Sequence, residues 1–99
     1  MEVSMIKHIV MWKFKEGEHD NMLLFRERLL ALKTQIPEIR EMEVGININP
    51  SERSYDAVLV SAFDSMEDLR SYSVNPLHVA VSDFCKTIRT NSVSVDYEF

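Results

Sequence analysis

The amino-acid sequence predicts an α+β fold in which helices pack on one face of an antiparallel sheet. Segments with strand-like and helix-like apolar spacing follow one another in the order β-α-β-β-α-β along 99 residues. The first and third predicted strands are apolar on both faces, as the two central strands of such a sheet must be. Together these observations indicate the ferredoxin-like arrangement, as one domain over residues 1–99.

Residues 5–14 are predicted to form the first strand, because apolar side chains occupy both faces of its alternation. His8 shares one face with Val10 and Trp12, and we expect this face to meet the helices. Residues 19–36 predict a helix with a continuous apolar stripe, which Pro37 ends.

Two-residue periodicity predicts three further strands. Residues 41–48 alternate between apolar and polar, so this strand has one dry face, whereas residues 55–63 are apolar on both faces. Residues 92–99 alternate again, and we expect the apolar set to face inward: Val93, Val95, Tyr97 and Phe99.

The segment between residues 63 and 88 predicts two helices with a break at Asn75. Ser65 begins the first helix as part of a Ser-x-x-Asp capping box, and Pro76 suits the first position of the second. His78 then lies in a first helical turn, where free N–H groups and the helix dipole favour neutral imidazole. The predicted apolar stripe of the second helix is Leu77, Ala80, Phe84 and Ile88.

The composition excludes several classes of partner. A net charge of −5 without a Lys/Arg cluster argues against nucleic acid and anionic membranes, and no apolar run approaches ~18 residues. Three histidines without metal-site spacing predict no metal, and no motif predicts a cofactor. Cys85 is the single cysteine and is expected to be a buried, inert thiol, which favours a reducing cytoplasm.

The second face of the sheet is expected to be too apolar for a monomer. With both helices on one side, the other side exposes Met5, Ile9, Met11 and one face of the third strand. We therefore expect a homodimer in which a two-fold axis closes two sheets into a dimeric α/β barrel.

A candidate site follows if the two short helices cross above the first strand. His8, Tyr72 and His78 then converge on one cavity as base, orienting donor and general acid. The lining is expected to include Val10, Trp12, Leu69 and Phe84. The alternative roles are structural: a satisfied core histidine at His8, core packing of Tyr72, and a capping or exposed first-turn residue at His78.

Several short stretches resemble the stress-responsive dimeric α/β-barrel (Dabb) family: residues 6–10 (Ile-Lys-His-Ile-Val), Ile36-Pro37, Val44-Gly45, Tyr55-Asp56 and residues 63–78. The resemblance implies a ferredoxin-like protomer, a homodimer and a pocket between sheet and helices. A plant polyketide cyclase of this family is similar to the chain at His8, Tyr72 and His78. It differs where this chain has Ala57 and Leu29.

Four functions remain open at this stage. The first is a dimer whose pocket binds a small apolar or carbonyl-bearing metabolite. The second is a polyketide-cyclase-like lyase that uses His8, Tyr72 and His78 in aldol or enolisation chemistry. The third is a cofactor-free or haem-dependent monooxygenase, as related dimeric barrels imply, and the fourth is a purely structural protein.

Overall fold

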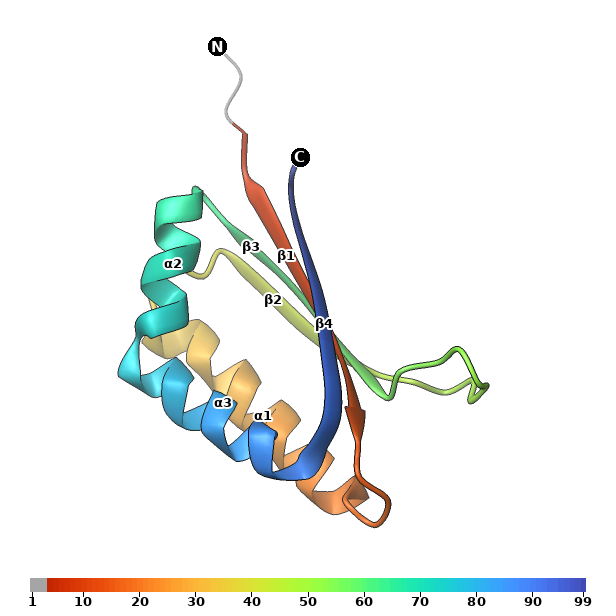
Figure 1. The fold of residues 1–99 in the computed structure, drawn as a ribbon. Coiled ribbons are helices and arrows are strands. Elements are labelled where there is room, and N and C mark those ends of the chain that lie inside the picture. Colours follow the sequence, from red (N-terminus) through yellow and green to blue (C-terminus); the bar gives the residue numbers. More distant parts are fainter. Residues whose placement is uncertain (1–3) are drawn as a thin grey trace.

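A computed structural model describes residues 4–99 of the chain, in which three helices cover one face of a four-stranded sheet (Figure 1). The order along the chain is the predicted one. The elements are β1 (Ile6–Phe14), α1 (His19–Gln35), β2 (Glu41–Ile46), β3 (Ala57–Phe63), α2 (Met66–Val74), α3 (Pro76–Ile88) and β4 (Arg89–Glu98).

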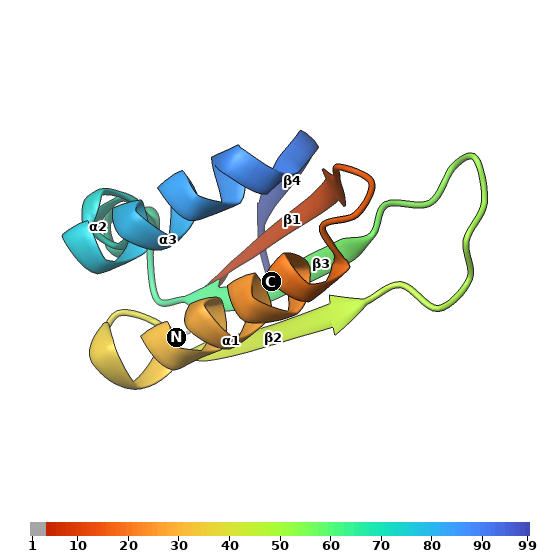
Figure 2. The same ribbon diagram turned by 90° about the horizontal axis from the view of Figure 1, so that it is seen from below.

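The strands lie side by side in the order β2-β3-β1-β4, and each neighbouring pair is antiparallel. The two strands with apolar residues on both faces, β1 and β3, are therefore central, as predicted. On the covered face, α1 lies nearer β2 and α3 lies nearer β4 (Figure 2). No helix of residues 4–99 covers the opposite face of the sheet.

The two short helices begin where the sequence predicts. The Ser65 hydroxyl accepts a hydrogen bond from the Asp68 N–H at 3.1 Å, and a cap of this kind stabilises a helix by ~1 kcal/mol. The Asn75 side chain accepts a hydrogen bond from the Leu77 N–H at 2.9 Å, and Pro76 opens α3. Each helix is thus capped separately, and the chain turns between Tyr72 and His78.

The core fills the space between the helices and the covered face. Trp12 of β1 and Phe25 of α1 meet edge to face with ring centroids 5.0 Å apart, which contributes ~0.5–1.5 kcal/mol beyond their burial. Leu59 of β3 is almost completely buried in the same core, and Phe63, at the other end of β3, packs against Tyr72 with ring centroids 5.1 Å apart. This layer supports the floor of the site described below.

The apolar face of α3 differs from the predicted stripe. The residues that turn toward the core are Val81, Cys85 and Ile88, whereas Leu77 is 46% exposed and Phe84 is only partly buried. The predicted stripe is confirmed at Ile88 but was wrong at Leu77, Ala80 and Phe84, because α3 carries apolar residues on more than one side. Packing against α1 and the sheet selects the stripe that also contains His78.

The inward face of β4 is also opposite to the prediction. Val93 pairs with Met11 and Val95 pairs with Ile9, so these side chains share the uncovered face of the sheet, as do those of Tyr97 and Lys7. Val95 is 54% exposed there. The register with β1 sets this orientation, since it turns the serines and Asp96 toward the helices. The uncovered face is therefore even more apolar than the sequence predicts.

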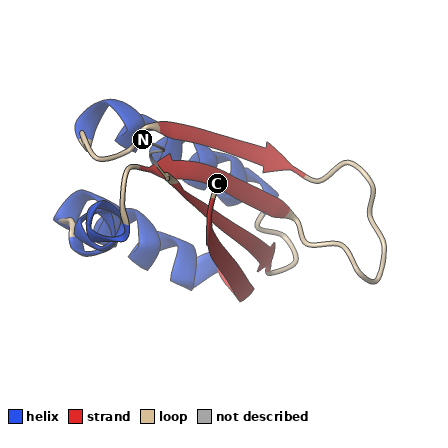
Figure 3. Ribbon diagram, turned by 90° about the horizontal axis from the view of Figure 1, so that it is seen from above, coloured by secondary structure: helices blue, strands red, loops and turns tan. Residues whose placement is uncertain are grey.

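The loop of residues 47–56 joins β2 to β3 and projects beyond the sheet (Figure 3). The predicted second strand extended to Ile48, but β2 ends at Ile46 and Ile48 is 95% exposed. The alternation of apolar and polar residues continues past Ile46 in the sequence, but Ile46 is the last residue of β2 with a partner on β3.

Candidate functional site

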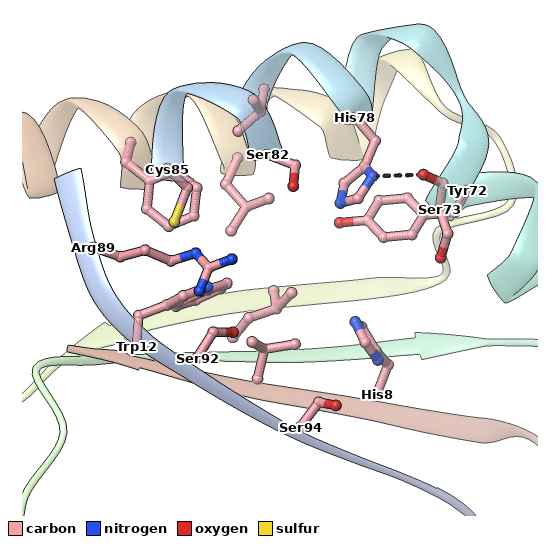
Figure 4. A pocket seen from close by; sticks show the side chains of 15 residues that line it. His8, Trp12, Tyr72, Ser73, His78, Ser82, Cys85, Arg89, Ser92 and Ser94 are labelled. Atoms are coloured by element: carbon pink, nitrogen blue, oxygen red, sulfur yellow. Dashed lines mark hydrogen bonds between the residues drawn. The ribbon is translucent and has the colours of Figure 1, made fainter. Parts of the chain in front are cut away.

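A cavity of about 250 Å³ lies between the covered face of the sheet and the helices (Figure 4). Its volume is just below the ~300–1,000 Å³ typical of drug-sized ligand pockets, so it suits a small metabolite. Strands β1, β3 and β4 and all three helices contribute to it. The lining consists of His8, Val10, Trp12, Phe25, Leu29, Leu59, Tyr72, Ser73, His78, Val81, Ser82, Cys85, Arg89, Ser92 and Ser94.

His78 presents one free nitrogen at the roof of the cavity. Its Nδ1 lies 3.0 Å from the Ser73 carbonyl oxygen, which only accepts, so Nδ1 carries the proton and Nε2 keeps its lone pair. Burial lowers the pKa of His78; the hydrogen bond to the Ser73 carbonyl opposes this shift, and the neighbouring His8 adds slightly to it. A neutral imidazole was predicted from the helix N-terminus, but burial is the largest cause.

Tyr72 places a hydroxyl group next to that imidazole. Its side chain is 1% exposed, and its ring centroid lies 4.3 Å from that of His78. The hydroxyl is buried and has no hydrogen-bond partner among residues 4–99. Burial raises the pKa of Tyr72, so the group is a protonated donor. An unsatisfied buried hydroxyl costs ~1–3 kcal/mol, which a ligand oxygen would relieve.

His8 faces the same cavity from the floor. Its ring centroid lies 6.4 Å from that of Tyr72. Its Nδ1 lies 2.5 Å from Oδ1 of Asp96, its partner across the β1–β4 ladder, so Nδ1 donates and Nε2 remains available. The buried Ser61 hydroxyl donates to the His8 carbonyl oxygen at 3.0 Å. Both neighbouring strands therefore hold His8 in place.

The structure brings together most of the residues that the sequence singles out. His8, Tyr72, His78, Val10 and Trp12 all line the cavity. Their chemical roles stay predictions.

Two expected lining residues lie elsewhere. Leu69 is buried in the core without lining the cavity. The ring of Phe84 packs under the Arg28 guanidinium, 4.7 Å from it, because it lies on the side of α3 that faces α1.

The main residues that sequence reasoning missed are Asp96, Arg89 and the serines of β4. Asp96 lies on β4 and pairs with the cavity residue His8. Asp56 instead joins the end of β1 to the start of β3, since its carboxylate accepts a hydrogen bond from the Phe14 N–H at 2.8 Å. The signal for Asp96 and the serines lies in the register of β4 against β1, which a single sequence does not display.

Burial also defines the state of the one thiol at the cavity. Cys85 is 3% exposed, and burial raises its pKa to about 11, so the thiol is protonated and inert. Among residues 4–99, no group of three or more His, Cys, Asp or Glu side chains is arranged to hold a metal ion. No helix in this part of the chain has the length and apolarity needed to span a membrane.

Comparison with known proteins gives one family. The model of the stress responsive A/B barrel domain matches residues 6–99. An uncharacterized protein of Streptomyces coelicolor is 33% identical over 98 residues, which cover 96% of this chain and all of that protein.

Solved structures share the fold. A dimeric ferredoxin-like protein of unknown function from Bacteroides fragilis is 36% identical, with a TM-score of 0.85 and 96% of each chain covered. The hydroxynitrile lyase of Passiflora edulis is 16% identical, with a TM-score of 0.88, and the match covers 99% of this chain and 95% of the lyase. The predicted ferredoxin-like fold is confirmed.

Proposed function

This chain belongs to the stress responsive A/B barrel domain family, and from that premise we propose that it is a homodimer whose pocket binds a small carbonyl-bearing metabolite. The observation that carries the proposal is the buried Tyr72 hydroxyl, which has no hydrogen-bond partner among the described residues 4–99 and lies beside His78 in the cavity. A carbonyl oxygen is the matching acceptor for such a donor.

The rest of the cavity supports a small, partly apolar ligand. Val10, Trp12 and Leu29 provide apolar walls, while the polar groups are few and convergent. This combination is typical of metabolite sites, in which a few polar groups orient a ligand that apolar contacts hold.

The uncovered face of the sheet supports the dimer. Met11, Val93, Val95 and Tyr97 form an exposed apolar surface on β1 and β4, which we call the open face. Burial of such a surface by a second copy is favourable at ~25 cal/mol per Å². The Bacteroides fragilis protein, 36% identical to this chain, is dimeric. The buried thiol of Cys85 suits a reducing cytoplasm.

Titration with small ketones tests the proposal. Trp12 is the only tryptophan and lines the cavity, so its fluorescence reports occupancy. We expect saturable binding of at least one small ketone to the wild type, with a loss of about tenfold in affinity for Tyr72→Phe. His19 is an exposed histidine outside the cavity, so His19→Ala is the control for His78→Ala. Identical titrations for wild type and Tyr72→Phe would contradict a carbonyl bound at this hydroxyl.

A second candidate is a lyase or isomerase that uses the same groups as acid and base. A neutral His78 with a free Nε2 can take a proton from the carbon next to a ketone, while the Tyr72 hydroxyl donates a hydrogen bond to the developing enolate oxygen. Transfer of this proton from His78 to the enolate oxygen completes enolisation, and its return to the carbon reverses it. In an aldol reaction the enolate carbon attacks a second carbonyl, and the resulting alkoxide takes the proton back from His78. A lyase on this fold has a precedent in the Passiflora edulis enzyme.

Exchange of α-protons in deuterated water, followed by NMR, tests this chemistry. General acid–base assistance contributes ~10²–10⁴-fold, so His78→Ala should lower the exchange rate by that factor. His19→Ala should leave the rate unchanged. Exchange in the wild type that equals the buffer rate for every ketone that binds would leave only the binding function.

A further inference from the structure

The cavity has a second polar end, opposite the two histidines. Arg89, the first residue of β4, turns its guanidinium into the cavity above Trp12, while His8 and His78 lie toward the other end (Figure 4). Ser92 lies on the same stretch of β4, close to the Arg89 end. The pocket therefore offers the Tyr72 hydroxyl as a donor beside the histidines and the Arg89 guanidinium as a donor at the other end.

The Arg89 guanidinium has no acidic partner in the part of the chain that the structure describes. No Asp or Glu carboxylate of residues 4–99 forms an ion pair with it within 4.0 Å. The side chain is half-buried, so water only partly replaces such a partner. A guanidinium in this situation is prepared to bind an anion, since its planar N–H groups match the two oxygens of a carboxylate.

The last carbonyl groups of α3 are bound by other donors, which leaves the Arg89 guanidinium free of them. Lys15 satisfies two of the last carbonyl groups of the helix: its Nζ donates to the Thr87 oxygen at 3.0 Å, and its N–H donates to the Ile88 oxygen at 2.9 Å. The Arg89 N–H donates to the Cys85 oxygen. The usual reason for a cation at a helix C-terminus, which is to bind free carbonyls, is met by Lys15 and by the Arg89 backbone.

We propose, on the basis of the function proposed above, that the ligand is an oxo acid whose carbonyl group lies at Tyr72 and His78 and whose carboxylate pairs with Arg89. Ser92 is the second donor to that carboxylate. A monoanion fits better than a phosphate, because Arg89 is the single Lys or Arg residue of the described lining and lies at the negative end of the α3 dipole, which disfavours a second negative charge.

A matched pair of ligands isolates the role of the charge. Levulinate and its longer straight-chain homologues are titrated against the dimer beside their methyl esters, with Trp12 fluorescence as the readout. The variants are Arg89→Gln, Arg89→Lys and, as a control on an exposed arginine outside the cavity, Arg70→Gln. Far-UV circular dichroism and thermal melts show whether each variant is folded.

We expect the wild type and Arg70→Gln to bind the best acid about tenfold to a hundredfold more tightly than its ester. Arg89→Gln should lose this preference while binding the ester as the wild type does, and Arg89→Lys should keep part of it.

Equal binding of acid and ester by the wild type, or a preference that survives Arg89→Gln, overturns the inference and leaves ketone binding intact. A phosphonate analogue that binds more tightly than the acid overturns the assignment to carboxylate. Absence of binding by every acid and ester overturns both this inference and the proposed function.

Discussion

His8 and Asp96 lie opposite one another on β1 and β4, and their side chains meet with Nδ1 and Oδ1 2.5 Å apart. The carboxylate fixes which nitrogen of His8 carries the proton, so Nε2 faces the cavity as an acceptor. The orientation of one site residue thus depends on the pairing of two strands.

Replacing Asp96 by alanine should release His8. We expect the free energy of unfolding to fall by ~0.5–1.5 kcal/mol, the usual contribution of one hydrogen bond, because the pair is partly exposed. The more specific readout is the imidazole tautomer, measured by long-range proton–nitrogen NMR at neutral pH. The wild type should show a protonated Nδ1 at His8, and Asp96→Ala should show a mixture of tautomers. The signals of His19 serve as the internal control.

Tyr72→Phe should separate binding from stability. The change removes a buried hydroxyl that has no partner among the described residues, so stability should stay the same or rise by up to ~1–3 kcal/mol. Tyr72→Ala removes the ring and should cost ~3–5 kcal/mol through the cavity that it leaves. Urea unfolding measures both. A clear loss of stability in Tyr72→Phe would mean that the hydroxyl has a partner in the free protein.

His78 should make the protein less stable in mild acid. Because burial lowers its folded-state pKa below the ordinary value of 6.5, the unfolded chain binds more protons in the window between the two values. Stability contributed by the neutral ring is complete above 6.5 and is lost as the pH falls toward the folded-state pKa.

Urea unfolding at fixed protein concentration, in neutral and in mildly acidic buffer, measures this dependence. His78→Gln should flatten it, whereas His19→Gln, at an exposed position, should not. An unchanged slope in His78→Gln would assign the dependence to other groups.

Val95→Glu should dissociate the proposed dimer. The substitution puts a charge in the middle of the open face, beside Ile9, where a partner subunit would bury it. Analytical ultracentrifugation should then show a folded monomer. Val79→Glu introduces the same charge at an exposed valine of α3, away from the open face, and should leave the dimer intact. A dimeric Val95→Glu protein would place the subunit contact elsewhere.

The sequence predicts much of the fold because local signals agree with it. Ser65, Asn75 and Pro76 define helix ends through short-range chemistry, and these ends are found where expected. The double-sided apolar character of β1 and β3 predicts their central positions. His8, Tyr72 and His78 reach one cavity because the separate capping of α2 and α3 places the last two on adjoining turns.

The parts that could not be predicted depend on pairing over long distances. Alternation in residues 92–99 separates two faces of a strand without indicating which of them meets the helices. The ladder with β1 decides this, and it turns Val95 outward and Asp96 inward. The phase of α3 is ambiguous for a similar reason, since a helix that is apolar on several sides has no unique buried stripe. Asp96 and Arg89 are therefore visible as site residues only in the folded structure.

Strand β4 turns Ser92 and Ser94 to the cavity, Asp96 to the cavity residue His8, and Val93 and Val95 to the open face. Any sliding or fraying of this edge strand therefore changes the cavity and the open face together. A metabolite that immobilises β4 from the cavity is expected to strengthen the association of the subunits at the open face. By thermodynamic reciprocity, dilution to monomers should lower the affinity for the metabolite.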